Sequence, residues 1–251
     1  MRIGDGHVVL ERPDATLRVL VFHHAGGSAM SYVPLAQRLP DGCEPFLFDL
    51  PGRGIRASEP PAADFDTAID QLLPVVAAAA DRPTVLVGHS LGALLAHSFA
   101  ARLPPSRVKA VVVSAFPSPE DTALAASHPA EPFQVRTRSQ LLSELRDRGG
   151  CPPEVFDDPE LLDLTITLMG HDLHLADTYR PPQAGNHADY HVWYGRDDEH
   201  VTLEELNRWA SATSGPLDVR EFRGGHFYLL QGEQAGNALR ELVAANCNGG
   251  L

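Results

Sequence analysis

Short runs of apolar residues alternate along most of this chain with longer segments in which apolar residues recur every three or four positions. The short runs are typical of buried strands and the longer segments of helices packed on one side. The predicted strands are residues 17–23, 45–50, 84–87, 108–114, 190–194 and 217–222. The predicted helices are residues 31–39, 67–80, 91–103, 202–212 and 233–245. This alternation predicts an α/β protein with a mostly parallel central sheet flanked by helices, and residues 8–10 could add an antiparallel edge strand.

The segment between residues 114 and 189 departs from this alternation. It holds about 75 residues without a convincing strand, far more than an ordinary connection between a strand and a helix needs. We therefore expect a single α/β domain over residues 1–251, in which residues 115–188, approximately, form an inserted helical lid. The pattern within this insertion predicts one helix over residues 137–147. A second, longer helix should begin with Asp158 as its N-cap and Pro159 in its first turn.

Apolar residues lie on more than one side of this longer helix, so we expect more than one side to be buried. They are Leu161, Leu162, Leu164, Ile166, Leu168, Met169 and Leu173. Two interpretations are open. The helix is either ordinary core, or a lid whose inner side lines an apolar substrate channel. For the second interpretation, the candidate lining residues are Leu168, Met169 and Leu173.

A serine between two glycines stands where the strand predicted over residues 84–87 gives way to a helical pattern. The sequence Gly88-His89-Ser90-Leu91-Gly92 has the form G-x-S-x-G, which in this setting places the serine at the tip of a sharp turn. The glycines are needed because a Cβ on either side of the strained serine would collide with the crowded backbone. A serine at a helix N-terminus also lies where free N–H groups favour negative charge. We predict that Ser90 is a nucleophile.

A serine nucleophile needs an imidazole base, and the imidazole needs a carboxylate that fixes its tautomer. Among 12 histidines, His226 is the best candidate for the base, because it follows the last predicted strand in a glycine-rich loop. The acid is expected after the strand over residues 190–194, where Asp197, Asp198 and Glu199 are adjacent. We favour Asp198, and we keep Asp197 and then Glu199 as alternatives.

The loop after the first long predicted strand reads Phe22-His23-His24-Ala25-Gly26-Gly27. A tetrahedral intermediate needs two preorganised donors, which here would be the backbone N–H groups of Ala25 and Leu91. His23 and His24 also suggest a metal site as an alternative. We do not favour it, because neighbouring side chains at a strand end point to opposite sides and no carboxylate lies at ligand spacing. No metal is predicted.

Composition narrows the class of partner and the compartment. A formal net charge of -13 over 251 residues argues against nucleic acid or an anionic membrane as the general partner. Cys43, Cys151 and Cys247 are odd in number and widely scattered, so neither a disulfide framework nor a thiolate zinc site is predicted. No run of about 18 apolar residues occurs, and no signal-peptide pattern opens the chain. We expect a cytoplasmic protein.

Four motifs, FHHAGG, GHSLGA, YGRDDEHVT and FRGGHFYL, resemble in order and spacing the type II, or editing, thioesterases of polyketide and nonribosomal peptide assembly lines. Residues 47–54, LFDLPGRG, also match that family, as does the lid segment that begins at Asp158. The resemblance implies an α/β-hydrolase fold, a Ser-His-Asp triad and an acyl-enzyme intermediate. The implied reaction hydrolyses acyl groups from the phosphopantetheine arm of acyl or peptidyl carrier proteins. It would remove aberrant or stalled acyl units without a metal or redox cofactor.

The resemblance places the catalytic serine, acid and histidine on Ser90, Asp198 and His226, and the oxyanion donors on Ala25 and Leu91. The chain departs from the family pattern at His23, Leu91, Glu199 and residues 116–119. These departures leave the triad in place and bear on substrate range and on entry past the lid. Other functions stay open: a carboxylesterase for small soluble esters, an acyltransferase to an amine or alcohol, and, more remotely, a non-catalytic ligand-binding module on the same fold.

Four arginines and no lysine lie on or beside the first helix of the insertion. They are Arg136, Arg138, Arg146 and Arg148. A planar guanidinium suits phosphate, so these residues are candidates for a patch that docks the carrier protein. The alternative is a solvated helix face paired with Glu144 and Asp147, and both interpretations stay open.

Overall fold

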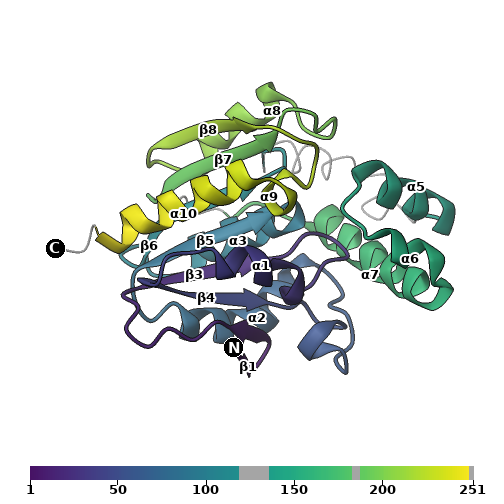
Figure 1. The fold of residues 1–251 in the computed structure, drawn as a ribbon, viewed down its shortest axis with the longest axis horizontal. Coiled ribbons are helices and arrows are strands. Elements are labelled where there is room, and N and C mark those ends of the chain that lie inside the picture. Colours follow the sequence, from purple (N-terminus) through teal and green to yellow (C-terminus); the bar gives the residue numbers. More distant parts are fainter. Residues whose placement is uncertain (119–135, 183–186, 249–251) are drawn as a thin grey trace.

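The computed structural model describes residues 1–118, 136–182 and 187–248 (Figure 1). In this part of the chain an eight-stranded sheet has the strand order β1-β2-β4-β3-β5-β6-β7-β8. Its strands are β1 Arg2–Gly4, β2 His7–Val9, β3 Leu17–Phe22, β4 Cys43–Phe48, β5 Thr84–His89, β6 Val108–Ser114, β7 Asp189–Gly195 and β8 Leu217–Phe222. The neighbours from β4 to β8 are parallel, whereas β1 and β2 are antiparallel at one edge. The mostly parallel sheet is confirmed, and the possible edge strand near residue 8 is β2, with β1 outside it.

Helices connect and cover these strands. They are α1 Val33–Gln37, α2 Phe65–Ala79, α3 Leu91–Arg102, α5 Arg138–Arg148, α6 Pro153–Asp157, α7 Pro159–Thr178, α8 Leu203–Asn207, α9 Tyr228–Gln231 and α10 Glu233–Asn248. Short 3-10 turns are η1 Ala29–Tyr32, η2 Gly54–Arg56 and η3 Arg208–Ala212. The helices predicted over residues 31–39 and 202–212 are each divided between an α-helix and a 3-10 turn. None of the helices in the described part of the chain is both long enough and apolar enough to cross a bilayer.

Alternate side chains of each central strand enter two different apolar cores, one on each face of the sheet. On β3, Leu20 and Phe22 belong to the core under α2 and α3, whereas Val19 and Val21 belong to the core under α1 and α10. Figure 1 shows helices on both sides of the sheet. A strand buried on both faces has no polar side, which explains why the sequence shows short continuous apolar runs.

The segment between β6 and β7 contains α5, α6 and α7, which form a lobe beside one end of the sheet (Figure 1). Thr137 and Gln140 form a capping box at the start of α5. The side chain of Asp158 accepts two backbone N–H groups at the start of α7, and Pro159 occupies the first turn, as predicted. Residues 119–135 and 183–186 of the predicted lid lie outside the described residues.

The prediction that more than one side of α7 is buried is wrong for the first turns of the helix. Ile166, Met169 and Leu173 are buried in a small core shared with α5. By contrast, Leu161 and Leu164 are 41 % and 53 % exposed. In these first turns the helix packs on one side only, and solvent reaches the other. Farther along, Leu173 enters the core shared with α5 and Leu175 enters the core under α2 and α3, so more than one side is buried there.

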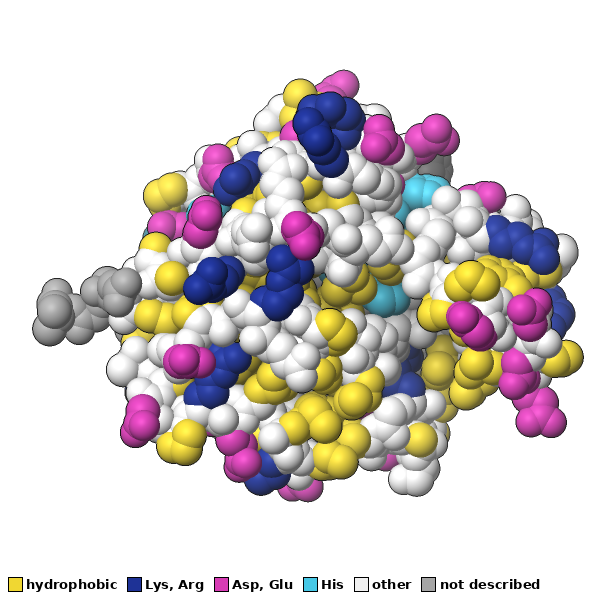
Figure 2. All heavy atoms as spheres, in the orientation of Figure 1, with side chains coloured by type: hydrophobic (Ala, Val, Ile, Leu, Met, Phe, Trp, Pro, Cys, Tyr) yellow, Lys and Arg dark blue, Asp and Glu magenta, His cyan; other side chains and the backbone are white. Residues whose placement is uncertain are grey.

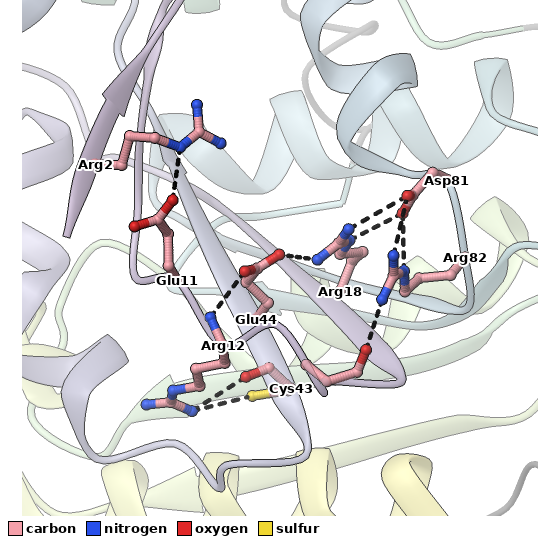
Figure 3. A network of polar contacts seen from close by, with 9 residues as sticks. Arg2, Glu11, Arg12, Arg18, Cys43, Glu44, Asp81 and Arg82 are labelled. Carbon is pink, nitrogen blue, oxygen red and sulfur yellow. Dashed lines mark hydrogen bonds and ion pairs between the residues drawn. The ribbon is translucent and has the colours of Figure 1, made fainter.

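An ion-pair network joins the strands at the opposite end of the sheet, where β3 and β4 begin (Figure 3). Arg18 is 9 % exposed and pairs with Glu44, its neighbour in the β3–β4 register, and with Asp81. The hydrogen bonds from Arg18, and then from Arg82, lower the pKa of Asp81 below its usual value although partial burial opposes them. This network links β3 to β4 and to the residues before β5, and it lies away from the carboxyl ends of the strands that carry the predicted catalytic residues.

Candidate active site

Ser90 stands at the turn between β5 and α3 in a strained backbone conformation. Its φ is 54° and its ψ is -124°, and a positive φ is uncommon for a residue that has a Cβ. A Cβ on Gly88 would lie 1.9 Å from the carbonyl oxygen of Gly92, and a Cβ on Gly92 would lie 2.1 Å from that of Phe22. The backbone N–H of Ser90 donates to the carbonyl oxygen of Ser114 on β6 at 2.8 Å. Close backbone packing therefore requires both glycines and holds the strained serine in place.

Asp198 and His226 meet at hydrogen-bond distance although 28 positions separate them in the sequence. Nδ1 of His226 donates to Oδ2 of Asp198 at 2.8 Å, and Oδ1 of Asp198 accepts the N–H of His200 at 3.0 Å. This bond leaves Nε2 of a neutral His226 as an acceptor, which is the tautomer that a serine base requires. Asp197 and Glu199 are exposed, so the structure brings only Asp198 of the three adjacent carboxyl groups to the histidine.

Several groups act on the pKa of Asp198. Burial alone would raise the pKa of this carboxyl group. The hydrogen bond from His226, the charge of that imidazole and the N–H of His200 outweigh burial, and together they lower the pKa below its usual value. An ionised carboxylate at this place stabilises the imidazolium that forms when the histidine takes a proton.

Backbone contacts hold the loop that carries the acid against the loop that carries the base. A Cβ on Gly195, at the end of β7, would lie 2.4 Å from the carbonyl oxygens of both Gly224 and Gly225. The N–H of Asp197 donates to the carbonyl oxygen of Gly224 at 3.0 Å. The glycine at the end of β7 therefore permits the close approach that places the two side chains together.

A small cavity joins the residues predicted to act together. It measures about 40 Å³, and its wall includes Ser90, His226, Ala25 and Leu91. Figure 2 shows histidine side chains at the seam between the body of the molecule and the lobe of α5 to α7. The structure thus brings together the predicted nucleophile, the predicted base and the two loops that carry the predicted oxyanion donors.

The lobe helix α7 contributes two of its three predicted lining residues to this cavity. Met169 and Leu173 line it, whereas Leu168 does not and is only half-buried. Successive residues of an α-helix are turned by about 100° from one another, so Leu168 faces a different direction from Met169. Leu168 thus lies apart from the cavity wall in this structure, and its contact with substrate stays a prediction.

Arg148, Phe116 and Phe227 also line the cavity, and none of them was predicted to do so. Nη1 of Arg148 lies 3.5 Å from Nε2 of His226, while Nε and Nη2 of the same guanidinium bind Glu144 at 3.1 and 2.8 Å. An arginine of the lobe thus faces the nitrogen that must accept the serine proton. The sequence signal for Arg148 is its place in the row of arginines, for which a docking patch and a paired helix face are both open interpretations.

The other arginines of that row have partners within the lobe. Arg136 makes a two-pronged pair with Asp177 at 2.5 and 2.9 Å, and Arg138 pairs with Asp163. Arg146 lies over the ring of Phe156 at 5.7 Å. These contacts favour the alternative of a paired helix face, although most of the acidic partners come from α7 and not from α5 itself.

The adjacent histidines of the β3 loop turn to different partners. Nδ1 of His23 donates to the carbonyl oxygen of His24 at 2.7 Å, and Nε2 accepts the N–H of Leu50 at 3.3 Å. Nδ1 of His24 lies 2.9 Å from the hydroxyl of Tyr32. Burial lowers the pKa of both imidazoles to about 3. Among the described residues, no group of three or more histidine, cysteine and acidic side chains is placed to hold a metal ion.

The family of the chain follows from comparison with known proteins. The thioesterase domain family matches residues 17–245. The chain belongs to this family. The match extends from β3 into α10, so it includes every residue of the site described above.

Relatives of this chain include proteins that are themselves named as thioesterases. The probable cadicidin biosynthesis thioesterase of Streptomyces griseus is 35 % identical over 222 residues, which are 86 % of this chain and 59 % of that protein. The chain thus spans less than two thirds of that relative's length. Thioesterase PikA5 of Streptomyces venezuelae is 30 % identical over 227 residues, which are 86 % of this chain and 77 % of that protein.

A solved structure supports the fold. The type II thioesterase BorB from the borrelidin biosynthetic cluster superposes with a TM-score of 0.79 at 32 % identity, over 95 % of this chain and 97 % of that one. The expectation of an α/β-hydrolase fold is confirmed.

Proposed function

We propose that this thioesterase hydrolyses acyl thioesters presented on the phosphopantetheine arm of acyl or peptidyl carrier proteins, and so removes aberrant or stalled acyl units. The observation that carries the proposal is the site itself: Ser90 on its strained turn shares one cavity with His226, which is paired with Asp198. The similarity to BorB, a type II thioesterase from a biosynthetic cluster, supports the choice of substrate class.

In the first half of the reaction, Oγ of Ser90 attacks the thioester carbonyl carbon while Nε2 of His226 takes the hydroxyl proton. The carbonyl oxygen becomes negative and accepts hydrogen bonds from the backbone N–H groups of Ala25 and Leu91. The carbon–sulfur bond then breaks. The pantetheine sulfur leaves with the proton returned by His226, and the acyl group stays on Ser90 as an ester.

In the second half, water enters and His226 takes one of its protons as the oxygen attacks the ester carbonyl. The same backbone donors stabilise the second oxyanion. Collapse of this intermediate breaks the bond to Ser90, which recovers its proton from the imidazolium, and the free acid departs. These steps use only side chains, backbone groups and water.

The cavity around Ser90 limits what can bind without movement. A volume of about 40 Å³ has room for ordered water but not for a long acyl chain together with the pantetheine arm. The proposal therefore includes displacement of part of the lobe when a carrier protein delivers its substrate.

The decisive experiment is mass spectrometry of a panel of acyl-loaded carrier proteins, from short acyl groups to long ones, before and after incubation with the enzyme. Wild-type protein should return the unloaded carrier. Ser90→Ala should fold normally and lose at least about 10⁴-fold in kcat. A serine variant that keeps a tenth of the wild-type rate would rule Ser90 out as the nucleophile.

Parallel arms separate the other candidate functions. Faster turnover of alkyl esters than of acyl pantetheine would indicate a carboxylesterase. Appearance of an amide or ester product when an amine or alcohol is added would indicate an acyltransferase. Absence of both turnover and labelling of Ser90 by a fluorophosphonate would indicate a binding module.

A further inference from the structure

A carboxylate from the lobe reaches the loop that carries a predicted oxyanion donor. Asp172 lies on α7 and is fully buried. Its Oδ2 accepts the backbone N–H of Gly26 at 2.7 Å, across 146 positions of sequence. Gly26 directly follows Ala25, so this hydrogen bond fixes one end of the peptide group that links the two residues.

The same carboxylate is bound by an arginine from the loop after β4. Nη1 and Nη2 of Arg53 lie 2.5 and 2.6 Å from the two oxygens of Asp172. Nη1 also donates to the carbonyl oxygen of Gly27 at 3.2 Å. Arg53 is 4 % exposed, so the pair is withdrawn from solvent, and it binds the β3 loop at two points, the Gly26 N–H and the Gly27 carbonyl oxygen.

The loop and the helix are also in direct contact. A Cβ on Gly26, whose φ is +76°, would lie 3.4 Å from Cβ and 3.7 Å from Cα of Met169. Met169 and Asp172 are three positions apart and therefore lie on the same side of α7. That side of the helix provides both a wall of the cavity and the acceptor for the loop.

Two further hydrogen bonds tie this half of α7 to the body of the molecule. Nε2 of His174 lies 3.0 Å from the carbonyl oxygen of Ala63, and the N–H of Phe65 donates to Oγ1 of Thr178 at 3.0 Å. The helix is thus held at Asp172, His174 and Thr178. It is positioned firmly enough to orient a loop.

The ion pair of Arg53 and Asp172 adds little net charge beside the predicted oxyanion hole. An isolated carboxylate close to an oxyanion hole would oppose the negative charge that develops on the substrate oxygen. The guanidinium of Arg53 offsets that charge through two parallel hydrogen bonds. Asp172 can therefore accept the Gly26 N–H while the pair as a whole adds little repulsion.

We propose that Asp172, neutralised by Arg53, is a positioning residue for the oxyanion hole. It holds the Ala25–Gly26 peptide group, which adjoins the His24–Ala25 peptide group that carries the N–H of Ala25. The carbonyl oxygen of this second group is bound by Nδ1 of His23 and the N–H of Gly27, so both peptide planes at Ala25 are fixed and its N–H can be held towards the thioester oxygen. Helix α7 is in this respect part of the catalytic apparatus and not only a cover over the cavity. The inference rests on the proposed function, because it assigns a role within the same reaction.

Two double variants separate this role from a purely structural one. Arg53→Met with Asp172→Leu replaces the buried pair by apolar side chains of similar size, a change that buried ion pairs often tolerate. The second double variant, Arg53→Met with Asp172→Asn, differs from the first only at position 172, where asparagine has nearly the size of leucine. The amide oxygen of this asparagine can still accept the Gly26 N–H. Asp177→Asn is the control. Asp177 also lies on α7 and also pairs with an arginine, but its partner is Arg136 of the lobe and not a residue of the body.

The assay measures kcat and KM for the acetyl thioester of N-acetylcysteamine, together with binding of a boronic acid that mimics the tetrahedral intermediate. The leucine double variant should lose about 10²-fold in kcat with KM little changed, comparable to the loss of one oxyanion donor. Its affinity for the boronic acid should fall in parallel. The asparagine double variant should stay within about tenfold of wild type, and Asp177→Asn should match wild type.

Equal kcat values for the leucine and asparagine double variants would overturn the inference while the proposed function stood. Absence of thioester hydrolysis by wild-type protein would instead overturn the proposed function. Should the leucine variant not fold, hydrogen exchange of wild-type protein decides the matter. The Gly26 N–H should exchange slowly without any ligand, and exchange at the rate of an open loop would refute the hydrogen bond to Asp172.

Discussion

Acidification is expected to destabilise this fold through imidazoles buried around the site. His23, His89 and His97 are 1 %, 0 % and 3 % exposed. Burial lowers the pKa values of His23 and His24 to about 3 and that of His97 to about 4, and it lowers the pKa of His89 well below its usual value. In the unfolded chain the same groups take up protons near about pH 6.5.

The direction follows from proton binding. Below about pH 6.5 the unfolded chain binds protons that the folded chain does not, so the free energy of unfolding falls as the pH falls. The contribution is fully present above that pH and is lost progressively towards the folded-state values of about 3 to 4. His23, His24 and His97, whose folded-state pKa values are about 3 to 4, each contribute about 1.4 kcal/mol per pH unit, so the three contribute about 4. By pH 5 the loss is about 6 kcal/mol, against a typical stability of about 5–15 kcal/mol.

Hydrogen bonding shows why His23 in particular stays neutral. Its Nδ1 donates to the carbonyl oxygen of His24 and its Nε2 accepts the N–H of Leu50. A proton on Nε2 would face that N–H and remove the acceptor. The pKa values of His7, His191 and His200 are also lowered, chiefly by burial, and act in the same direction.

The assay is urea unfolding, followed by circular dichroism at several pH values between about 7.5 and 5. His97→Gln keeps a side chain that can bind the Tyr190 hydroxyl, which lies 2.6 Å from Nδ1 of His97. The variant should lower the slope of unfolding free energy against pH by about 1.4 kcal/mol per pH unit, the value for one proton. His171→Gln is the matched control, because the side chain of His171 is exposed, and it should change the slope much less than His97→Gln does. A wild-type slope of unfolding free energy against pH below about 1.4 kcal/mol per pH unit, the value for one proton, would refute the reasoning.

Two further predictions concern the triad and the turn. Asp198→Asn should cost about 10⁴-fold in kcat for thioester hydrolysis because the histidine loses its correct tautomer, whereas Asp197→Asn should be mild; the reverse ranking would move the acid by one residue. Gly88→Ala should abolish fluorophosphonate labelling of the serine and lower the melting temperature, because its Cβ would lie 1.9 Å from the carbonyl oxygen of Gly92. Gly170→Ala, whose Cβ would meet only a side-chain carbon, is the control, and normal labelling of Gly88→Ala would contradict the argument.

The sequence by itself determined those features that depend on neighbouring residues. Runs of apolar residues located the parallel strands, because strands buried on both faces have no polar positions. Asp158 and Pro159 marked the start of α7, since a cap and a first-turn proline act within one turn of helix. The glycines around Ser90 identified the turn as a local motif: the crowding at Gly88 comes from Gly92, whereas that at Gly92 comes from Phe22 at the end of β3.

The tertiary structure alone decided which residues meet across the fold. The sequence favoured Asp198 but left Asp197 and Glu199 open as alternatives, and only packing of the loops after β7 and β8 buries Asp198 beside His226. Sequence periodicity placed Leu168 in the cavity wall, but the direction that α7 presents to the body depends on contacts with the β3 loop. Arg53 lay in a recognised motif without an assigned role, because its partner Asp172 is 119 positions away. Local sequence fixes backbone preferences over a few residues, whereas contacts between distant side chains exist only once the sheet and the lobe have packed together.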